Sequence, residues 1–214
     1  MNMKKIFCLI LSLALVLCCA ACGSGGEGDA PAITQEMLMG ITEGTIYTNE
    51  AMGIRFELDD TWTIFDETQL AELSGITADV LDDEALVEKL QESGTSYVFY
   101  AATNDGLYNL GIVWEDLGKL YGKVIDEETY AEIGVSQLPE ALESAGIENV
   151  TAEASNISFA GQDHAAIVVT GEMMGVGFYE TLVCVKAGDY MAVITAASYM
   201  DNATGQILAM ASGI

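Results

Sequence analysis

The stretch Glu180–Ser198, ETLVCVKAGDYMAVITAAS, decides the fold class of this chain. Two runs rich in apolar residues flank Ala187-Gly188-Asp189, and a short glycine-containing link of this kind is typical of a turn between antiparallel strands. Within the first run, Leu182–Val185 is apolar without alternation, as expected for a strand that is buried on both faces. The stretch therefore predicts a central hairpin of an antiparallel sheet that is covered on both sides.

Two further strand-like segments precede this hairpin. Val150–Ser158 and Ala165–Glu172 are joined by a turn at Ala160-Gly161-Gln162-Asp163, and a glycine-rich turn leads on to Gly177–Lys186. With Tyr190–Ser198 these segments predict a four-stranded meander, because short links join neighbouring antiparallel strands.

The first half of the chain predicts more strands, and one strong hairpin signal. Asn104-Asp105-Gly106 separates the strand-like segments Ser96–Thr103 and Leu107–Glu115, and Asp-Gly tolerates the positive backbone angles of a tight turn. Shorter strands are expected within residues 45–47, 53–58 and 62–65.

Capping residues and apolar spacing predict helices between the strands. We expect them at residues 66–75, with Asp66 as the cap, at 82–93, at 127–144 and from Asn202 through Met210. Pro139 is a position at which the third helix could break or kink, and Gly146 should end it. Residues 33–44 fit either a short helix or an ordered tether. The predicted fold class is α+β, with a central antiparallel sheet covered by helices on its faces.

The predicted order of elements resembles the PsbP fold, and one local motif carries the resemblance. Tyr47-Thr48-Asn49-Glu50, followed by Gly53–Trp62, is similar to the opening hairpin of such proteins, with Asp59 near the place where they usually have proline. The resemblance implies an α/β/α sandwich over residues 45–214 and extends to uncharacterised lipoproteins of clostridial bacteria. It implies no function, since one fold hosts many activities.

The N-terminus predicts export and a lipid anchor. Lys4 and Lys5 precede an apolar run over residues 6–21, a pattern typical of a signal peptide. Ala20-Ala21-Cys22 at its end resembles the lipobox of bacterial lipoproteins, with Cys19 at the position where that motif usually has Leu. The resemblance implies a diacylglyceryl group on Cys22 and cleavage before it. An ordinary secretory signal, or a metal site at the clustered cysteines, is the alternative.

The predicted organisation follows from this motif. Residues 1–21 form the signal peptide, residues 22–44 carry the lipid and a flexible tether, and residues 45–214 form one globular domain. The predicted location is the extracytoplasmic face of the cell membrane, with the lipid on Cys22 as the anchor.

The charge of the chain excludes several classes of partner. Removal of residues 1–21 takes away Lys4 and Lys5 and no acidic residue, so five basic residues remain against 33 acidic ones and the formal charge moves from −26 to −28. Nucleic-acid binding needs clustered Lys and Arg, so nucleic acid is not an expected partner. Solubility explains the acidity, and a positive partner or bound cations are the alternative.

We find no catalytic or metal-binding motif, and we expect no enzyme activity, cofactor or metal. His164 is the only histidine and is expected in the core or at a turn, whereas Cys184 in Leu182–Val185 is expected to be a small buried hydrophobe. Acidic clusters at residues 79–84 and 126–128 fit helix starts better than calcium loops.

The most promising surface in the sequence is Trp114, followed by Glu115 and Asp116 at a strand end. Packing in the strand core explains most aromatic residues of this half of the chain, and an exposed aromatic beside carboxylates, which would suit a ligand or a protein partner, is the alternative for Trp114. We therefore expect a lipid-anchored binding or interaction module of the cell envelope. The alternatives are a lipoprotein that binds a small solute or cation for a transporter and, last, a hydrolase with a dispersed site.

Overall fold

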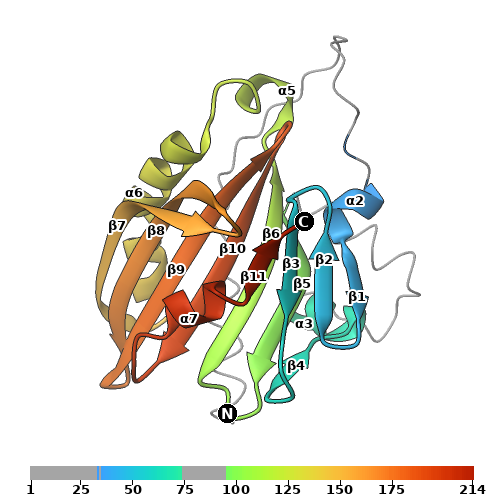
Figure 1. Cartoon of the computed structure of the whole chain (residues 1–214). Coiled ribbons are helices and arrows are strands. Elements are labelled where there is room, and N and C mark those ends of the chain that lie inside the picture. Colours follow the sequence, from blue (N-terminus) through green and yellow to red (C-terminus); the bar gives the residue numbers. More distant parts are fainter. Residues whose placement is uncertain (1–32, 34, 74–94) are drawn as a thin grey trace.

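Two antiparallel sheets form the body of the protein in a computed structural model that describes Ile33, residues 35–73 and residues 95–214 (Figure 1). The helices are α2 Gln35–Met39, α3 Glu67–Leu73, α5 Gly118–Tyr121, α6 Glu127–Ser144 and α7 Thr204–Leu208. The strands are β1 Ile41–Glu43, β2 Ile46–Asn49, β3 Ile54–Glu57, β4 Trp62–Ile64, β5 Thr95–Thr103, β6 Tyr108–Asp116, β7 Ile147–Phe159, β8 Gln162–Met173, β9 Val176–Ala187, β10 Tyr190–Tyr199 and β11 Ala211–Gly213.

The larger sheet has seven strands in the order β4-β5-β6-β10-β9-β8-β7, and all its pairs are antiparallel. The hairpin predicted from Glu180–Ser198 lies in the middle of this sheet, where Val183 pairs with Ile194 and Ala187 pairs with Tyr190. The predicted meander and the predicted hairpin at Asn104-Asp105-Gly106 are therefore confirmed.

The central strands are buried on both faces because their side chains alternate between two core layers. On β9, Leu182 and Cys184 pack in the layer beneath α6, whereas Val183 and Val185 pack in the layer beneath the smaller sheet. This explains why the segment is apolar without alternation.

The smaller sheet joins the two ends of the described chain. Its order is β1-β2-β3-β11, and Ala211 of the C-terminal β11 pairs with Phe56 of β3 (Figure 1). Phe56 is completely buried, and its ring lies parallel to that of Phe99 on β5 with 6.4 Å between centroids. Burial of these aromatic side chains holds the two sheets together.

The helix α6 has the bounds that the sequence predicts. The Asp126 carboxylate accepts a hydrogen bond from the backbone N–H of Thr129 at 2.8 Å and caps its first turn. Pro139 lies inside the helix without ending it, and Gly146 follows the helix with a φ of +94° that favours glycine. The buried face of α6 presents Tyr130 and Leu138 to the larger sheet.

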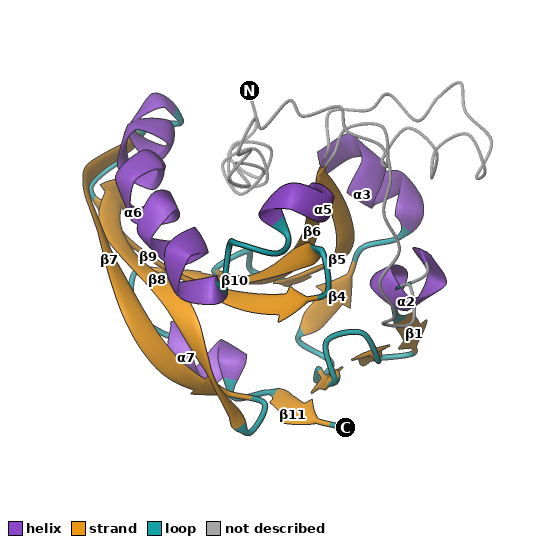
Figure 2. Cartoon of the chain, turned by 90° about the horizontal axis from the view of Figure 1, so that it is seen from above, coloured by secondary structure: helices purple, strands orange, loops and turns teal. Residues whose placement is uncertain are grey.

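The two faces of the larger sheet are covered differently. Figure 2 shows α3, α5 and α6 on one side, and α7 with β11 on the other. The prediction of an α+β fold with an antiparallel sheet is confirmed, but the second face is covered by the four-stranded sheet together with α7. The sequence did not predict β1 or β11, because each has only three residues, none of them buried, and so shows no apolar alternation.

Three predicted boundaries differ from the structure. Of the two interpretations of residues 33–44, the short helix is confirmed as α2, but β1 follows it and Leu38 and Met39 pack against the core, so ordered structure begins before the predicted domain boundary at residue 45. The last helix ends at Leu208, and its N-cap position is Ala203 rather than Asn202. The helix predicted at 82–93 lies outside the described residues. In the described part of the chain, no helix is long and apolar enough to span a bilayer.

Candidate functional site

The structure separates the three residues predicted to form a surface. Trp114 is only 3% exposed, packs in the layer beneath the smaller sheet and donates a hydrogen bond from Nε1 to the Leu38 carbonyl oxygen at 2.7 Å. Glu115 points to the opposite face, where it is 7% exposed and its Oε2 accepts a hydrogen bond from the Tyr130 hydroxyl at 2.6 Å. Asp116 is exposed and accepts a hydrogen bond from the Gly118 backbone N–H.

The expected ligand surface at Trp114, Glu115 and Asp116 is therefore corrected. Neighbouring residues of a strand point to opposite faces, and both faces of β6 are buried at this point. Burial raises the pKa of Glu115, and the hydrogen bond from Tyr130 acts in the opposite direction. Trp114 and Glu115 are structural residues of two different core layers.

His164 and Glu127 form an ion-pair geometry between β8 and the first turn of α6. The His164 Nδ1 atom lies 3.1 Å from both carboxylate oxygens of Glu127, and the Lys186 backbone N–H donates to Glu127 Oε1 at 2.8 Å. The Glu127 carboxylate thus links the first turn of α6 to β8 through His164 and to β9 through Lys186. From the sequence, Glu127 is expected only as a residue of the helix start. Its pairing with His164 could not be predicted, because the two residues are 37 positions apart.

Cys184, the only cysteine among the described residues, is not an activated nucleophile beside this pair. Cys184 is fully buried, and burial raises the pKa of its thiol to about 12. A thiol with such a pKa stays protonated and unreactive at neutral pH. Among the described residues, no three His, Cys, Asp or Glu side chains are grouped so as to hold a metal ion. Of the two acidic clusters, residues 126–128 start α6, and residues 79–84 lie outside the described residues.

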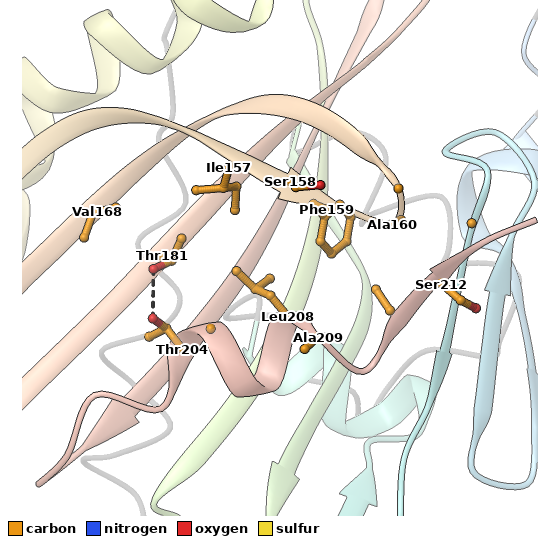
Figure 3. Close-up of a pocket in the computed structure, with 14 residues that line it drawn as sticks. Ile157, Ser158, Phe159, Ala160, Val168, Thr181, Thr204, Leu208, Ala209 and Ser212 are labelled. Carbon is orange, nitrogen blue, oxygen red and sulfur yellow. Dashed lines mark hydrogen bonds between the residues drawn. The ribbon is translucent and has the colours of Figure 1, made fainter.

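A groove between β7–β9 and the segment from α7 to β11 is the candidate functional site (Figure 3). Its volume is about 450 Å³, which lies in the range of sites for small ligands. Ile157 on β7 and Leu208 on α7 point toward one another across it (Figure 3). The Thr181 hydroxyl donates a hydrogen bond to Thr204 Oγ1 at 3.0 Å and joins the sheet to the start of α7.

No residue that lines this groove carries a charge. Its fourteen lining residues are apolar, glycine, serine or threonine, with Phe159 and Val168 among the apolar ones and Ser158 and Ser212 among the hydroxyls. Two other hollows of similar size contain carboxylates, at Asp59 and Asp105 in one and at Asp126 and Glu128 in the other. An uncharged groove on so acidic a chain favours a neutral ligand, since charged groups would have to leave water without a partner.

Close backbone packing shapes one end of the groove. A Cβ atom on Gly213 would lie 2.7 Å from the carbonyl oxygen of Ala160, so only glycine lets β11 approach the β7–β8 turn this closely. Ala160 itself has a φ of +49°, an uncommon conformation for a residue with a side chain. This site could not be predicted from the sequence, because its residues come from separate segments of the chain and none of these segments carries a catalytic motif.

Comparisons with known proteins show only distant structural likeness. No protein-family model and no curated protein matches the chain. A solved structure from Bacteroides thetaiotaomicron is 11% identical with a TM-score of 0.38; it covers 81% of this chain, which spans 49% of that protein. A structure of LpqN from Mycobacterium tuberculosis, described as involved in cell envelope biogenesis, is 12% identical with a TM-score of 0.34, and the match covers 74% of this chain and 82% of LpqN.

Proposed function

We propose that this chain is a lipid-anchored, non-enzymatic binding module on the extracytoplasmic face of the cell membrane. The uncharged groove between β7–β9 and α7 is its binding site, and this groove is the observation that carries the proposal. A neutral ligand, or an uncharged segment of an envelope protein, would contact Ile157 and Leu208. It could form hydrogen bonds with the hydroxyl groups of Ser158 and Ser212.

The N-terminal sequence supports the anchor. Lys4 and Lys5, the apolar run over residues 6–21 and the Ala20-Ala21-Cys22 motif together fit export followed by lipidation of Cys22. A diacyl anchor holds far more firmly than a single chain, because each buried methylene adds about 0.8 kcal/mol.

The side-chain chemistry supports binding rather than catalysis. Glu127 is engaged by His164 and by the Lys186 backbone, and Cys184 is buried with a raised pKa. Neither the groove nor the His164–Glu127 pair presents an activated nucleophile in the described part of the chain.

A small-solute binding role in the service of a transporter is the second candidate. The groove volume of about 450 Å³ favours it, since this volume suits a small molecule better than an extended protein surface. A cation is not the expected solute of this groove, because no lining residue provides a carboxylate.

The test combines intact mass with a groove variant. Membrane-extracted protein should begin at Cys22 and carry a diacylglyceryl group on it, and Cys22→Ala should lack both the lipid and the cleavage that follows lipidation. Native mass spectrometry and affinity capture from the envelope should then identify one bound molecule or one partner that Ala209→Lys abolishes, since Ala209 is exposed and lines the groove.

The control is Gln206→Lys, which adds the same charge on α7, three residues before Ala209. Gln206 lies outside the groove and lines the separate hollow at Asp59 and Asp105. Retention of the ligand or partner in Gln206→Lys and its loss in Ala209→Lys would support the groove. Equal binding in both variants would exclude the groove as the binding site. An unmodified N-terminus would refute the anchor.

A further inference from the structure

Two of the five basic residues that follow Cys22 lie on one short loop. After Cys22 the chain has five basic residues, which are Arg55, Lys89, Lys119, Lys123 and Lys186. Arg55 pairs with Glu57 at 3.0 Å, and Lys89 lies outside the described residues. Lys119 and Lys123 are exposed, and neither is in an ion pair with any residue that the structure describes.

These two lysines stand beside two exposed apolar side chains. Leu120 follows Lys119 and is 67% exposed, and Val124 follows Lys123 and is 66% exposed. The α5 loop, residues 118–124, therefore presents two pairs of a lysine and an apolar residue, one pair on α5 and the other in the turn that follows it. Alternation of lysine with exposed apolar side chains is typical of segments that lie at a membrane surface.

The α5 loop is held in place by the body of the protein. The Leu117 backbone N–H donates to the Asp189 carbonyl oxygen at 3.0 Å, and Lys186 Nζ donates to the Gly122 carbonyl oxygen at 2.5 Å. A Cβ atom on Gly122 would lie 2.7 Å from the Cα atom of Asp189, so the loop sits directly against the β9–β10 turn. These contacts fix the position of the loop, and Leu120 and Val124 are exposed in that position.

The chain that leads to the anchor arrives at the same turn. Ile33 packs beside Gly188, where an added Cβ atom would lie 3.3 Å from Ile33 Cδ1. Ten residues separate Ile33 from Cys22, so the covalent path from the lipid spans at most ~40 Å. Figure 1 shows α5 and α2 at the same end of the strands.

We infer that the α5 loop is a second membrane contact, in which Leu120 and Val124 enter the interface of a phospholipid bilayer and Lys119 and Lys123 approach the lipid phosphates. The inference rests on the proposed anchor at Cys22. Asp116 and Asp189 lie near the same end, so the apolar pair provides most of the affinity and the lysines provide the orientation. The contact would orient the domain on the membrane.

A second pair of exposed apolar residues, comparable to Leu120 and Val124, lies at the end of β9 and β10 that is opposite to the α5 loop. Met174 is 75% exposed and Met200 is 65% exposed, and the Met200 backbone N–H donates to the Gly177 carbonyl oxygen. No Lys or Arg occurs within residues 171–177 or 199–203. Met174 is therefore the control position for contact with lipid.

The test uses the mature lipidated chain in vesicles of phosphatidylglycerol and phosphatidylethanolamine with brominated acyl chains, which quench tryptophan fluorescence on contact. Leu120→Trp and Met174→Trp are compared, with the wild type giving the background of Trp62 and Trp114. We expect quenching of the tryptophan introduced at position 120 and none at position 174. Equal quenching at the two positions, or no quenching at position 120, would overturn the inference.

Flotation of the vesicles separates this test from that of the anchor. A chain that fails to float carries no lipid, which refutes the proposed anchor but leaves the loop testable after coupling of the Cys22 thiol to a maleimide phospholipid. The coupled chain is produced to begin at Cys22, so that it lacks Cys8, Cys18 and Cys19, and Cys184 does not compete for the reagent because it is buried. Adding Lys119→Glu and Lys123→Glu to the Leu120→Trp variant should diminish the quenching, and unchanged quenching would remove the lysines from the proposal.

Discussion

The Tyr130 hydroxyl lies 2.6 Å from Glu115 Oε2, in the layer between α6 and the larger sheet. Tyr130 is 1% exposed, and Glu115 needs a donor at this depth because a buried carboxylate without one loses its hydration. This hydrogen bond joins β6, which carries Glu115, to α6, which carries Tyr130.

Removing this donor should destabilise the protein in a pH-dependent manner. Tyr130→Phe should lower the free energy of unfolding by about 1–3 kcal/mol at pH 8. Burial already raises the pKa of Glu115, and loss of the hydrogen bond should raise it further. The penalty should therefore be smaller at pH 4, where the carboxyl is increasingly protonated in both states. Urea denaturation at the two pH values measures it, and a penalty larger at pH 4 would contradict the prediction.

Glu180 should make the folded state less stable as the pH rises. It is 5% exposed, and burial raises its pKa from 4.5 to about 7. Its favourable contribution is complete below pH 4.5, and it is lost as the pH rises through about 7. Glu180→Gln should therefore raise the free energy of unfolding by about 2–3 kcal/mol at pH 8 and by little at pH 4.

The control for Glu180 is the exposed Glu172 on β8. Glu172→Gln should change the free energy of unfolding by no more than about 0.5 kcal/mol at either pH. Thermal unfolding at pH 4 and pH 8 compares the variants, and the same stability change for Glu180→Gln at both values would exclude a titrating carboxyl at this position.

The Glu127 carboxylate should contribute to the docking of α6. Glu127→Ala removes the acceptor of the Lys186 backbone N–H and the partner of His164, which should cost about 1–3 kcal/mol of stability. Glu128→Ala, one residue further on, removes an exposed carboxylate from the same helix turn and should cost about 0.5 kcal/mol. Chemical denaturation measures both, and equal losses would mean that the pairing with His164 and Lys186 is not stabilising.

Two glycines that flank the groove should respond in opposite ways to alanine. Gly213→Ala brings a Cβ atom to within 2.7 Å of the Ala160 carbonyl oxygen and should destabilise the protein by about 1–3 kcal/mol. Gly205→Ala, in α7 with open space at its Cβ position, should stabilise it by about 0.5–1 kcal/mol. Thermal unfolding of both variants tests the pair, and a stabilising Gly213→Ala would contradict the close approach of β11 to the β7–β8 turn.

Local sequence signals determined most of the individual elements. Asn104-Asp105-Gly106 and Ala187-Gly188-Asp189 specify turns through backbone preference, and Asp126 and Gly146 mark the ends of α6. Such signals act over a few residues, so they can be found without knowledge of the remaining chain. The motif at Cys22 that resembles a lipobox is also a local signal, and the lipid anchor remains a prediction because Cys22 lies outside the described residues.

The tertiary structure decided which residues are buried together and where a ligand could bind. The sequence left Trp114 open to two interpretations, strand core or a surface beside two carboxylates, and the packing of α2 and the smaller sheet buries it in the core. The short strand β11 forms only because β3 offers it an edge, and the groove exists only where α7 and β11 meet β7–β9. These features depend on contacts between distant segments, and such contacts leave no periodic pattern in the sequence.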